Sequence, residues 1–426
     1  MPAMMIYNLF PPLAGSFTQW RPHMKRASEM GFNWIFVNPV QYTGFSGSLY
    51  SIKNYFWLNQ RFVDHESPLG PEEQLRGAIK YAADLGMGMM VDLVINHAAI
   101  DSDLIKEHPD WFLHEEDGEV SRPFCYEDGK KVVWGDLARF DHESKDLEGL
   151  YQYFLKVVLH MIGQGFRAFR CDAAYQVPRT LWSRLIADVK RAHPGTLFLA
   201  ETLGCLPEET VETALAGFDY VFNSSKWWDM HSEWLPEQYE MTREAAPSVS
   251  FPETHDTTRI IEDLAGDVEA VKQRYLFAAL FSAGVMAPIG FEYCFKRKLS
   301  VVETTPADWE SVNAYLTGFI REVNAIKSAN PAFHEDAPTR FMDSPDDGAL
   351  IMIKESSLTG QGALLIFNKS FTEPCKLRLD LGALMDRAVI EDMRDISPTG
   401  TQTSPANQLS IELPPSGSKV LVSNAR

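Results

Sequence analysis

The first three quarters of the chain alternate two hydrophobic patterns. Short runs of continuous apolar residues, typical of strands buried on both faces of a parallel sheet, are separated by longer segments with apolar residues at helical spacing. The strand-like runs are 4–9, 34–38, 88–94, 167–171, 197–201, 220–223, 249–253 and 286–291. The helix-like segments include 72–84, 147–162, 178–191, 208–214, 268–281 and 308–327. Eight strand–helix units predict an α/β fold, the (β/α)8 TIM barrel.

The main alternative is a doubly wound open sheet. That fold places a glycine-rich nucleotide-binding turn after its first strand, and no such turn follows residues 4–9. The barrel is therefore the favoured prediction.

Two segments depart from the alternating pattern. Residues 98–141, after the third strand, lack a long regular pattern and predict a short insertion subdomain over the barrel mouth. Near the C-terminus, short strand-like runs separated by Gly, Pro and Ser turns predict an antiparallel β-sandwich domain. These runs are 349–356, 362–370, 375–381, 387–393, 409–415 and 419–425. We therefore expect a catalytic barrel at 1–97 and 142–335, an insertion at 98–141 and a C-terminal domain at 336–426.

Composition narrows the choice of partners and compartment. The 426 residues include 39 Lys and Arg against 58 Asp and Glu, a net charge of −19, which disfavours nucleic acids and anionic membranes as partners. The N-terminus lacks the pattern of a signal peptide, and no apolar run is long enough to span a membrane. The five cysteines include no CxxC pair, which predicts free thiols. Together these features predict a cytoplasmic location; they say nothing of the oligomeric state.

Polar residues cluster where the predicted strands end. Reactive groups of a TIM barrel lie at the C-terminal ends of its strands, so these residues are candidates for a site. Any one of these residues is equally well explained as a structural polar residue. Chance is a poor explanation for polar residues at the ends of four strands. The candidates are Asp92, Asn96 and His97 at the end of strand three, Arg170 and Asp172 at the end of strand four, Glu201 at the end of strand five, and His255 and Asp256 at the end of strand seven.

The surroundings of two carboxylates predict different protonation. Arg170 and Asp172 are two residues apart on a strand, so they point to the same side, and the guanidinium favours the ionised form of Asp172. Glu201 follows the apolar run LFLA, where partial desolvation would raise its pKa. An ionised carboxylate and a protonated one are the nucleophile and acid of a retaining glycosidase. Asp256 is then suited to stabilising positive charge at the transition state.

Four segments resemble, in order, the signature regions of glycoside hydrolase family 13, the α-amylase family: DLVINH, FRAFRCDAA, FLAET and FPETHD. The resemblance implies a barrel with an insertion after strand three and a C-terminal β-sandwich. It implies Asp172 as nucleophile, Glu201 as general acid/base and Asp256 as transition-state stabiliser. It also implies that His97, Arg170 and His255 bind substrate.

A fifth segment and several departures bear on the substrate. SLYSIKNYF resembles the family's tyrosine stretch, which implies that Tyr50 stacks on the sugar at the cleaved bond, although Ser51 and Asn54 replace its Asp residues. Tyr175 and Gln176 stand where amylases often carry Lys-His against the leaving-group sugar. With the short insertion, these departures predict short α-glucosides or maltooligosaccharides as substrates rather than starch.

The resulting hypothesis is a retaining α-glucoside hydrolase that works by double displacement. The alternative is a glucosyl- or maltosyl-transferase that uses the same residues with a glucan or phosphate as acceptor. A remote alternative from another class is a non-catalytic sugar-binding protein. No organic cofactor is required, and the resemblance allows a calcium ion near Asn96, although the usual insertion-loop ligands are not recognisable.

Overall fold

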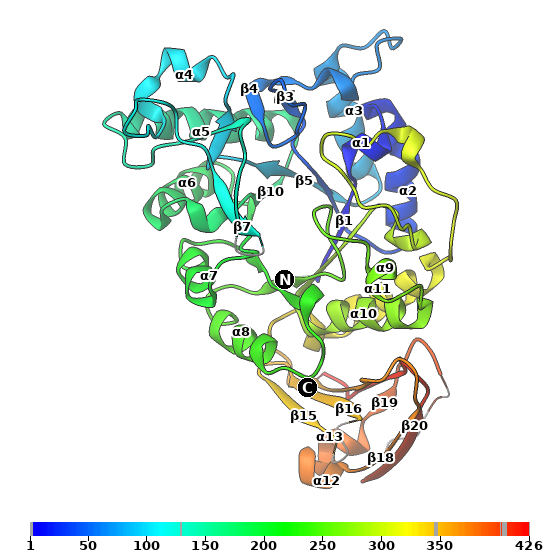
Figure 1. The fold of residues 1–426 in the computed structure, drawn as a ribbon. Helices are drawn as coiled ribbons and strands as arrows, with labels where there is room; N and C mark the ends of the chain where they lie inside the picture. Colours follow the sequence, from blue (N-terminus) through cyan, green and yellow to red (C-terminus); the bar gives the residue numbers. More distant parts are fainter. Residues whose placement is uncertain (1–2, 128–129, 345–347, 401, 403–406, 426) are drawn as a thin grey trace.

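Eight parallel strands close into a barrel in the computed structural model, which describes residues 3–127, 130–344, 348–400, 402 and 407–425 (Figure 1). The closed order is β1-β14-β13-β12-β11-β10-β5-β2, and every neighbouring pair is parallel. The strands are β1 (Met4–Asn8), β2 (Trp34–Val37), β5 (Gly88–Leu93), β10 (Ala168–Cys171), β11 (Leu197–Ala200), β12 (Tyr220–Phe222), β13 (Ser248–Ser250) and β14 (Gly284–Pro288). The predicted TIM barrel is confirmed.

The continuous apolar character of these strands has a direct cause. Alternate side chains point inward and outward, and both sets are buried. Ile6, Phe36, Met90 and Leu199 are among those that fill the barrel interior, whereas their outward-facing neighbours join the core beneath the helices. A parallel barrel with helices outside therefore leaves no polar face on its strands.

Helices surround the barrel (Figure 1). The longer ones are α2 (Arg21–Glu29), α3 (Pro71–Asp84), α5 (Leu147–Gln164), α6 (Arg179–Ala192), α7 (Pro207–Ala214), α8 (Trp234–Thr242), α10 (Val268–Phe281) and α11 (Thr317–Ala329). Two short ones are α1 (Pro11–Ala14) and α9 (Ile260–Asp263). None of the helices in the described part of the chain has the length and apolarity needed to span a membrane.

The helix predicted over 308–327 is wrong in its first half, because α11 begins only at Thr317. The preceding residues bind the loop after β14 instead. Both oxygens of Glu310 accept from the backbone N–H of Lys296, at 3.1 and 3.0 Å, and the N–H of Asn313 donates to the carbonyl of Tyr293 at 3.1 Å. Tertiary hydrogen bonds thus replace helical ones in this segment.

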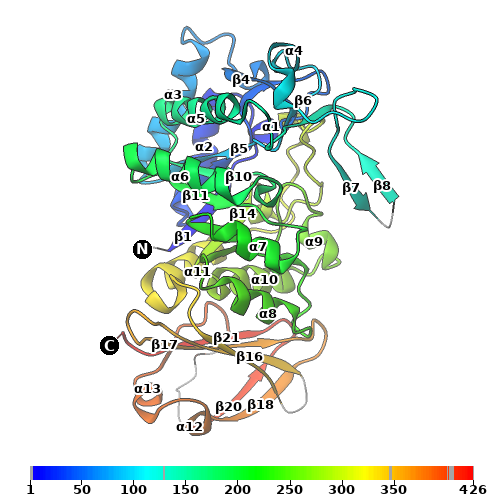
Figure 2. The ribbon, with the colours of Figure 1, turned by 90° about the vertical axis from the view of Figure 1, so that its left-hand side faces the viewer.

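The insertion is joined to the barrel by a small antiparallel pair, β6 (His97–Ala99) with β9 (Leu137–Arg139). Between them lie the short helix α4 (Leu104–Glu107) and a hairpin of β7 (Phe124–Glu127) and β8 (Lys130–Val133), which projects from the body of the molecule (Figure 2). A second hairpin, β3 (Gln41–Thr43) with β4 (Ile52–Leu58), follows β2 and was not predicted from the sequence.

Two antiparallel sheets form the C-terminal β-domain, as predicted. One has the order β15-β16-β17-β21-β19, and the other pairs β18 with β20. Their strands are β15 (Thr339–Asp343), β16 (Ala349–Glu355), β17 (Gly362–Asn368), β18 (Cys375–Asp380), β19 (Arg394–Asp395), β20 (Gln408–Leu413) and β21 (Ser418–Val422). A separate core lies between the sheets, and Phe367 packs on Phe277 of α10 with ring centroids 5.7 Å apart.

The strand predicted at 387–393 is wrong. The segment contains the helix α13 (Arg387–Glu391), which follows α12 (Leu381–Leu384). Val389, Ile390 and Met393 are buried at helical spacing, and the Nε of Arg387 lies 2.7 Å from Oε1 of Glu391 one turn away. The short apolar run between turn residues suggested a strand, although its spacing also suits one helix face.

Cys171, Cys205 and Cys294 are free thiols, as expected. Cys205 is half-buried, and Cys171, Cys294 and Cys375 are buried. The side chain of Cys125 lies outside the described part of the structure.

Candidate active site

A cavity of about 450 Å³ opens at the C-terminal ends of the barrel strands. It brings together residues that are far apart in the sequence, from the barrel, the insertion and the loop after β14. The lining residues are Ser48, Tyr50, Asn96, His97, Pro123, Trp134, Asp136, Leu137, Asp172, Ala173, Tyr175, Gln176, Asp256, Val301 and Val302. Of the predicted site residues, Asp92, Arg170, Glu201 and His255 do not line the cavity but contact residues that do.

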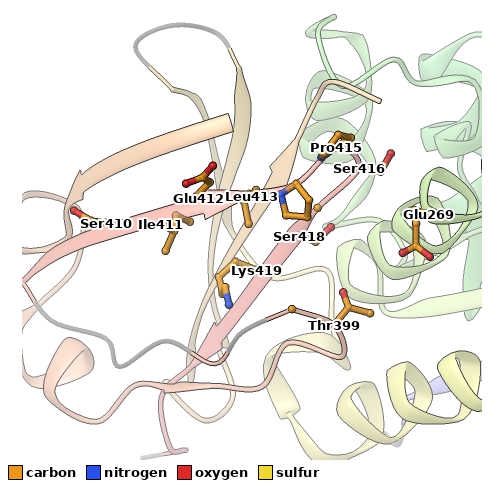
Figure 3. Close-up of a pocket in the computed structure, with 13 residues that line it drawn as sticks. Glu269, Thr399, Ser410, Ile411, Glu412, Leu413, Pro415, Ser416, Ser418 and Lys419 are labelled. Atoms are coloured by element: carbon orange, nitrogen blue, oxygen red, sulfur yellow. The ribbon is translucent and has the colours of Figure 1, made fainter. Parts of the chain in front are cut away.

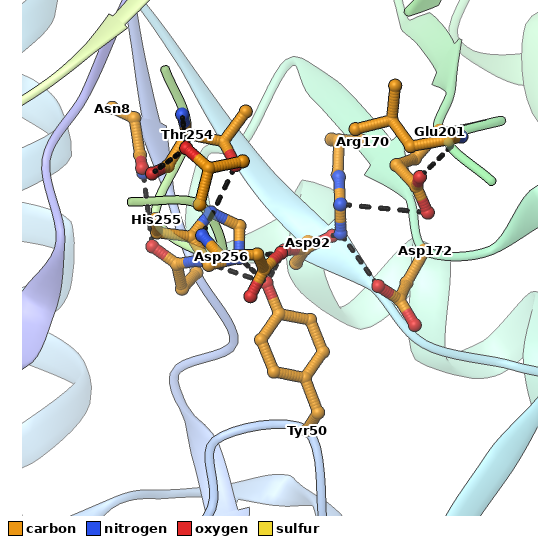
Figure 4. A network of polar contacts seen from close by, with 12 residues as sticks. Asn8, Tyr50, Asp92, Arg170, Asp172, Glu201, Thr254, His255 and Asp256 are labelled. Atoms are coloured by element: carbon orange, nitrogen blue, oxygen red, sulfur yellow. Dashed lines mark hydrogen bonds and ion pairs between the residues drawn. The ribbon is translucent and has the colours of Figure 1, made fainter. Parts of the chain in front are cut away.

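Arg170 lies at the centre of the polar network (Figure 4). Its Nη1 is 2.8 Å from Oδ1 of Asp92 and 2.8 Å from Oδ1 of Asp172, and its Nη2 is 3.7 Å from Oε2 of Glu201. Burial opposes the charge, but Asp92 and the other carboxylates raise the pKa of Arg170 well above its usual value. One guanidinium therefore contacts both carboxylates of the predicted pair.

The predicted nucleophile has one bound and one unbound oxygen. Arg170 holds Oδ1 of Asp172, whereas Oδ2 makes no hydrogen bond to any residue in the described ranges. Asp172 follows the last residue of β10, and its backbone N–H donates to the carbonyl of Leu93 at 3.0 Å. The carboxylate is thus fixed in direction and retains an oxygen able to bond to carbon.

Glu201 is held by two backbone amides. The N–H of Ala173 donates to Oε2 at 2.8 Å, and that of Leu203 donates to Oε1 at 2.7 Å. Burial raises the pKa of Glu201 to about 7, against the opposing effects of Arg170 and of these two amides. A raised pKa of Glu201 agrees with the desolvation expected from the apolar strand that precedes this residue.

Asp256 lies at the cavity wall with 61% of its side chain exposed, and its Oδ2 is 3.0 Å from Nε2 of His255. The surrounding protein opposes ionisation of this carboxylate, but the nearby His255 and Arg170 outweigh that effect and hold the pKa of Asp256 at about 2. Glu201 and Asp256 therefore differ in protonation near neutral pH.

Tyr50 connects the two halves of the network. Its hydroxyl donates to Oδ2 of Asp92 at 2.7 Å, accepts from Nδ2 of Asn38 at 2.9 Å and lies 2.7 Å from Nε2 of His255. The Tyr50 and His255 rings are stacked, with centroids 5.8 Å apart and planes 5° apart. Asn38, just past the end of β2, was missed, although the strand-end rule that identified the other candidates also applies to it.

His97 begins β6, and its Nε2 lies 3.2 Å from the carbonyl oxygen of Tyr50. Burial lowers the pKa of His97, so the ring is neutral at physiological pH. A neutral imidazole in the cavity wall carries both a donor and an acceptor, which suits contact with a hydroxyl group.

Tyr175 and Gln176 lie on a 3₁₀ turn, Ala174–Gln176, that follows the predicted nucleophile. Both line the cavity, and Oε1 of Gln176 accepts from Nδ2 of Asn96 at 3.5 Å. The Oδ1 of Asn96 is buried with no partner among the described residues. Those residues contain no group of three or more His, Cys, Asp or Glu arranged to hold a metal. Calcium near Asn96 remains a prediction, and no step below depends on it.

Two other side chains from loops at this end of the barrel are not part of the cavity. Glu253, in the FPETHD motif, is buried against Arg259, with 2.7 Å between Oε1 and Nη1, and its Oε2 accepts from the N–H of Ile260 at 2.6 Å. Trp228 is buried against Phe277. Both therefore contribute to packing or to the support of a loop.

A cavity of about 500 Å³ also lies between the β-domain and Glu269 of α10 (Figure 3). It is slightly larger than the one at the barrel mouth, but none of the predicted site residues lines it. The chemistry therefore identifies the smaller cavity as the candidate active site.

The family described as glycogen debranching enzyme, glucanotransferase domain, matches residues 1–117. Two alpha-1,4-glucan:maltose-1-phosphate maltosyltransferases are similar over most of the chain. The one from Methylacidiphilum infernorum is 25% identical over 394 residues, which are 85% of this chain and 58% of that protein. The one from Myxococcus xanthus is 28% identical over 374 residues, 81% of this chain and 54% of that protein. The chain thus spans little more than half the length of these relatives.

Solved structures share the fold over the whole chain. The maltogenic alpha-amylase from Thermotoga neapolitana superposes with a TM-score of 0.79 at 20% identity, covering 99% of both chains. The trehalose-6-phosphate hydrolase from Bacillus licheniformis gives a TM-score of 0.78 at 12% identity, again over 99% of both chains. These solved structures show a shared fold, and the ordered motifs of the chain resemble those of the α-amylase family.

Proposed function

We propose that the protein is an enzyme that cleaves α-glucosidic bonds in short α-glucosides or maltooligosaccharides with retention of configuration. The observation that carries this proposal is the position of Arg170 between Asp172 and Glu201, which gives two carboxylates different environments. Asp172 forms a direct ion pair, whereas burial raises the pKa of Glu201 to about 7. A retaining glycosidase requires an ionised carboxylate as its nucleophile and a protonated carboxyl group as its acid.

The mechanism has two displacement steps. In the first, the free Oδ2 of Asp172 attacks the anomeric carbon while protonated Glu201 gives its proton to the leaving oxygen. In the second, the Glu201 carboxylate removes a proton from the incoming hydroxyl, which attacks the same carbon and breaks the ester to Asp172. Two inversions return the original configuration. Asp256, whose pKa is held at about 2, stays ionised and stabilises positive charge on the sugar ring.

Tyr50, His97 and His255 bind the reacting sugar in this proposal, and Tyr175 and Gln176 contact the group that leaves. The small cavity, with walls from the insertion and the loop after β14, supports a preference for short substrates. A cytoplasmic location, expected from composition and free thiols, is part of the same proposal.

The acceptor in the second step decides between hydrolysis and transfer. Water gives the hydrolase that the sequence favours, whereas a glucan or phosphate gives a transferase. The similarity to maltosyltransferases over 85% of the chain supports transfer as the second candidate. Hydrolysis and transfer share every step up to the covalent intermediate, so the same residues serve both reactions.

Product analysis tests the proposal. The enzyme is incubated with maltotriose alone, with added maltooligosaccharide and with inorganic phosphate, and the products are separated by chromatography. The sugar that leaves in the first step is released in either case. Free glucose and maltose as the sole products in all three incubations support the hydrolase, whereas longer chains or a sugar phosphate support the transferase. If no product forms under any condition but maltotriose binds, the remote alternative, a sugar-binding protein, replaces both.

A further inference from the structure

Trp134 lines the cavity from the insertion, just after β8, and no prediction from the motifs includes it. Its side chain is 39% exposed. No ring in the described ranges stacks on the indole, and the indole Nε1 donates to none of the residues described there. An aromatic face and a free donor therefore border the candidate active site.

The backbone around Trp134 is fixed on both sides. Its N–H donates to the carbonyl of Pro123 at 3.0 Å, and its carbonyl accepts from the N–H of Leu137 at 3.3 Å. The next turn is tied to the start of the insertion, because the carbonyl of Asp136 accepts from the N–H of Ile100 at 2.9 Å. Trp134 thus lies on a turn that is held at both ends by backbone hydrogen bonds.

The rest of the cavity gives the ring a specific surrounding. Val301 and Val302, from the loop after β14, supply apolar wall in addition to Trp134, whereas Tyr50 and Asp172 supply polar wall around the reacting position. A pyranose ring presents apolar C–H faces and a rim of hydroxyl groups. An aromatic and aliphatic surface continuous with a polar site fits the face of a sugar unit that adjoins the reacting one.

We propose that Trp134 stacks on the glucose unit adjacent to the reacting one and so makes the site selective for substrates of at least two sugar units. This inference rests on the function proposed above. It assigns to the insertion a specificity-determining residue that acts on binding and does not take part in bond breaking.

The test compares substrates with and without an adjacent sugar unit. α-Glucosyl fluoride has none, α-maltosyl fluoride carries one on the non-reducing side, and maltose carries one on the leaving-group side. For each longer substrate we take the ratio of its kcat/KM to that for α-glucosyl fluoride. In W134A this ratio should fall by about tenfold for at least one longer substrate, the size expected of one aromatic stacking contact. W134F keeps a ring and should retain most of the ratio.

Trp57→Ala is the matched control, because Trp57 is 64% exposed on β4 and does not line the cavity. Its ratios should equal those of the wild type. Unchanged ratios in W134A would overturn the inference, as would the same fall in W57A. Thermal unfolding of both variants checks that they fold.

Calorimetric binding of maltotriose separates this inference from the proposed function. If W134A weakens binding about tenfold while the wild type cleaves none of the substrates, stacking holds and the catalytic proposal fails. If the wild type is active but W134A binds maltotriose as tightly as the wild type does, catalysis holds and the stacking inference fails.

Discussion

The backbone N–H of Ala173 donates to Oε2 of Glu201 at 2.8 Å, so the residue next to the proposed nucleophile holds the proposed acid. Ala173 has φ 39°, in the left-handed region that non-glycine residues rarely adopt, and this conformation aims its N–H across to the end of β11. A second bond, from the N–H of Ala174 to the carbonyl of Glu201 at 2.9 Å, reinforces the connection. The loops after β10 and β11 are therefore positioned as one unit.

The pH profile should report on Glu201. Burial raises the pKa of this group to about 7, so the protonated form needed to assist the leaving oxygen is present below that pH and is lost above it. We expect kcat/KM for maltooligosaccharides to fall as pH rises through about 7. E201Q should lack this alkaline limb. A wild-type profile that is flat between pH 6 and 9, or an unchanged limb in E201Q, would contradict the assignment.

Leaving-group dependence tests the same residue without reference to pH. E201Q should lose most activity on maltooligosaccharides, whose leaving oxygen needs a proton, and less in the first step on an activated aryl α-glucoside. Azide should restore turnover of the aryl substrate, because it attacks the intermediate without the help of a base. Equal losses on both substrates without rescue by azide would mean that Glu201 only binds.

Arg259 should matter for stability. It pairs with Glu253 at 2.7 Å, and both side chains are almost fully buried. R259M leaves the Glu253 carboxylate buried without its cation, which should lower the free energy of unfolding by about 3–5 kcal/mol. Denaturant unfolding measures this. The double variant R259M/E253Q should recover part of the lost free energy of unfolding, since it removes the unpaired charge. If it recovers none, the loss in R259M comes from altered packing.

Chain length should have little influence beyond the first few sugar units. Tyr175 and Gln176 line the cavity and are proposed to contact the leaving group, and the insertion is short, so we expect few contacts to distant units. Steady-state kinetics from maltose to maltoheptaose and on soluble starch should show kcat/KM levelling off by maltotriose. A steady rise with length, with starch the best substrate, would restore an amylase assignment.

The barrel was predictable because its signal is repeated eight times along the chain. Strands such as Gly88–Leu93 and Ala168–Cys171 are buried on both faces, and the residues that follow them converge for a geometric reason that does not depend on loop structure. The arrangement of Asp172, Glu201 and Asp256 around one mouth follows from that rule.

Features set by tertiary contacts were not predictable. Hydrogen bonds to the loop after β14 delay the start of α11 until Thr317, and Glu253 of the FPETHD motif is buried against Arg259, six residues later. Trp134 reaches the cavity only because the ends of the insertion pair with each other. Local patterns carry no information about such long-range partners.

Trapping the covalent intermediate tests the central claim most directly. The enzyme is incubated with 5-fluoro-α-glucosyl fluoride, whose ring fluorine slows the second displacement, and is examined by mass spectrometry as intact protein and after digestion. We predict a mass increase of one fluoroglucosyl group, located on Asp172 and absent from D172N, which should also lose at least about a thousandfold in turnover. An active enzyme that forms no adduct, carries the label on another residue, or keeps more than about a tenth of its activity as D172N would contradict the proposed mechanism.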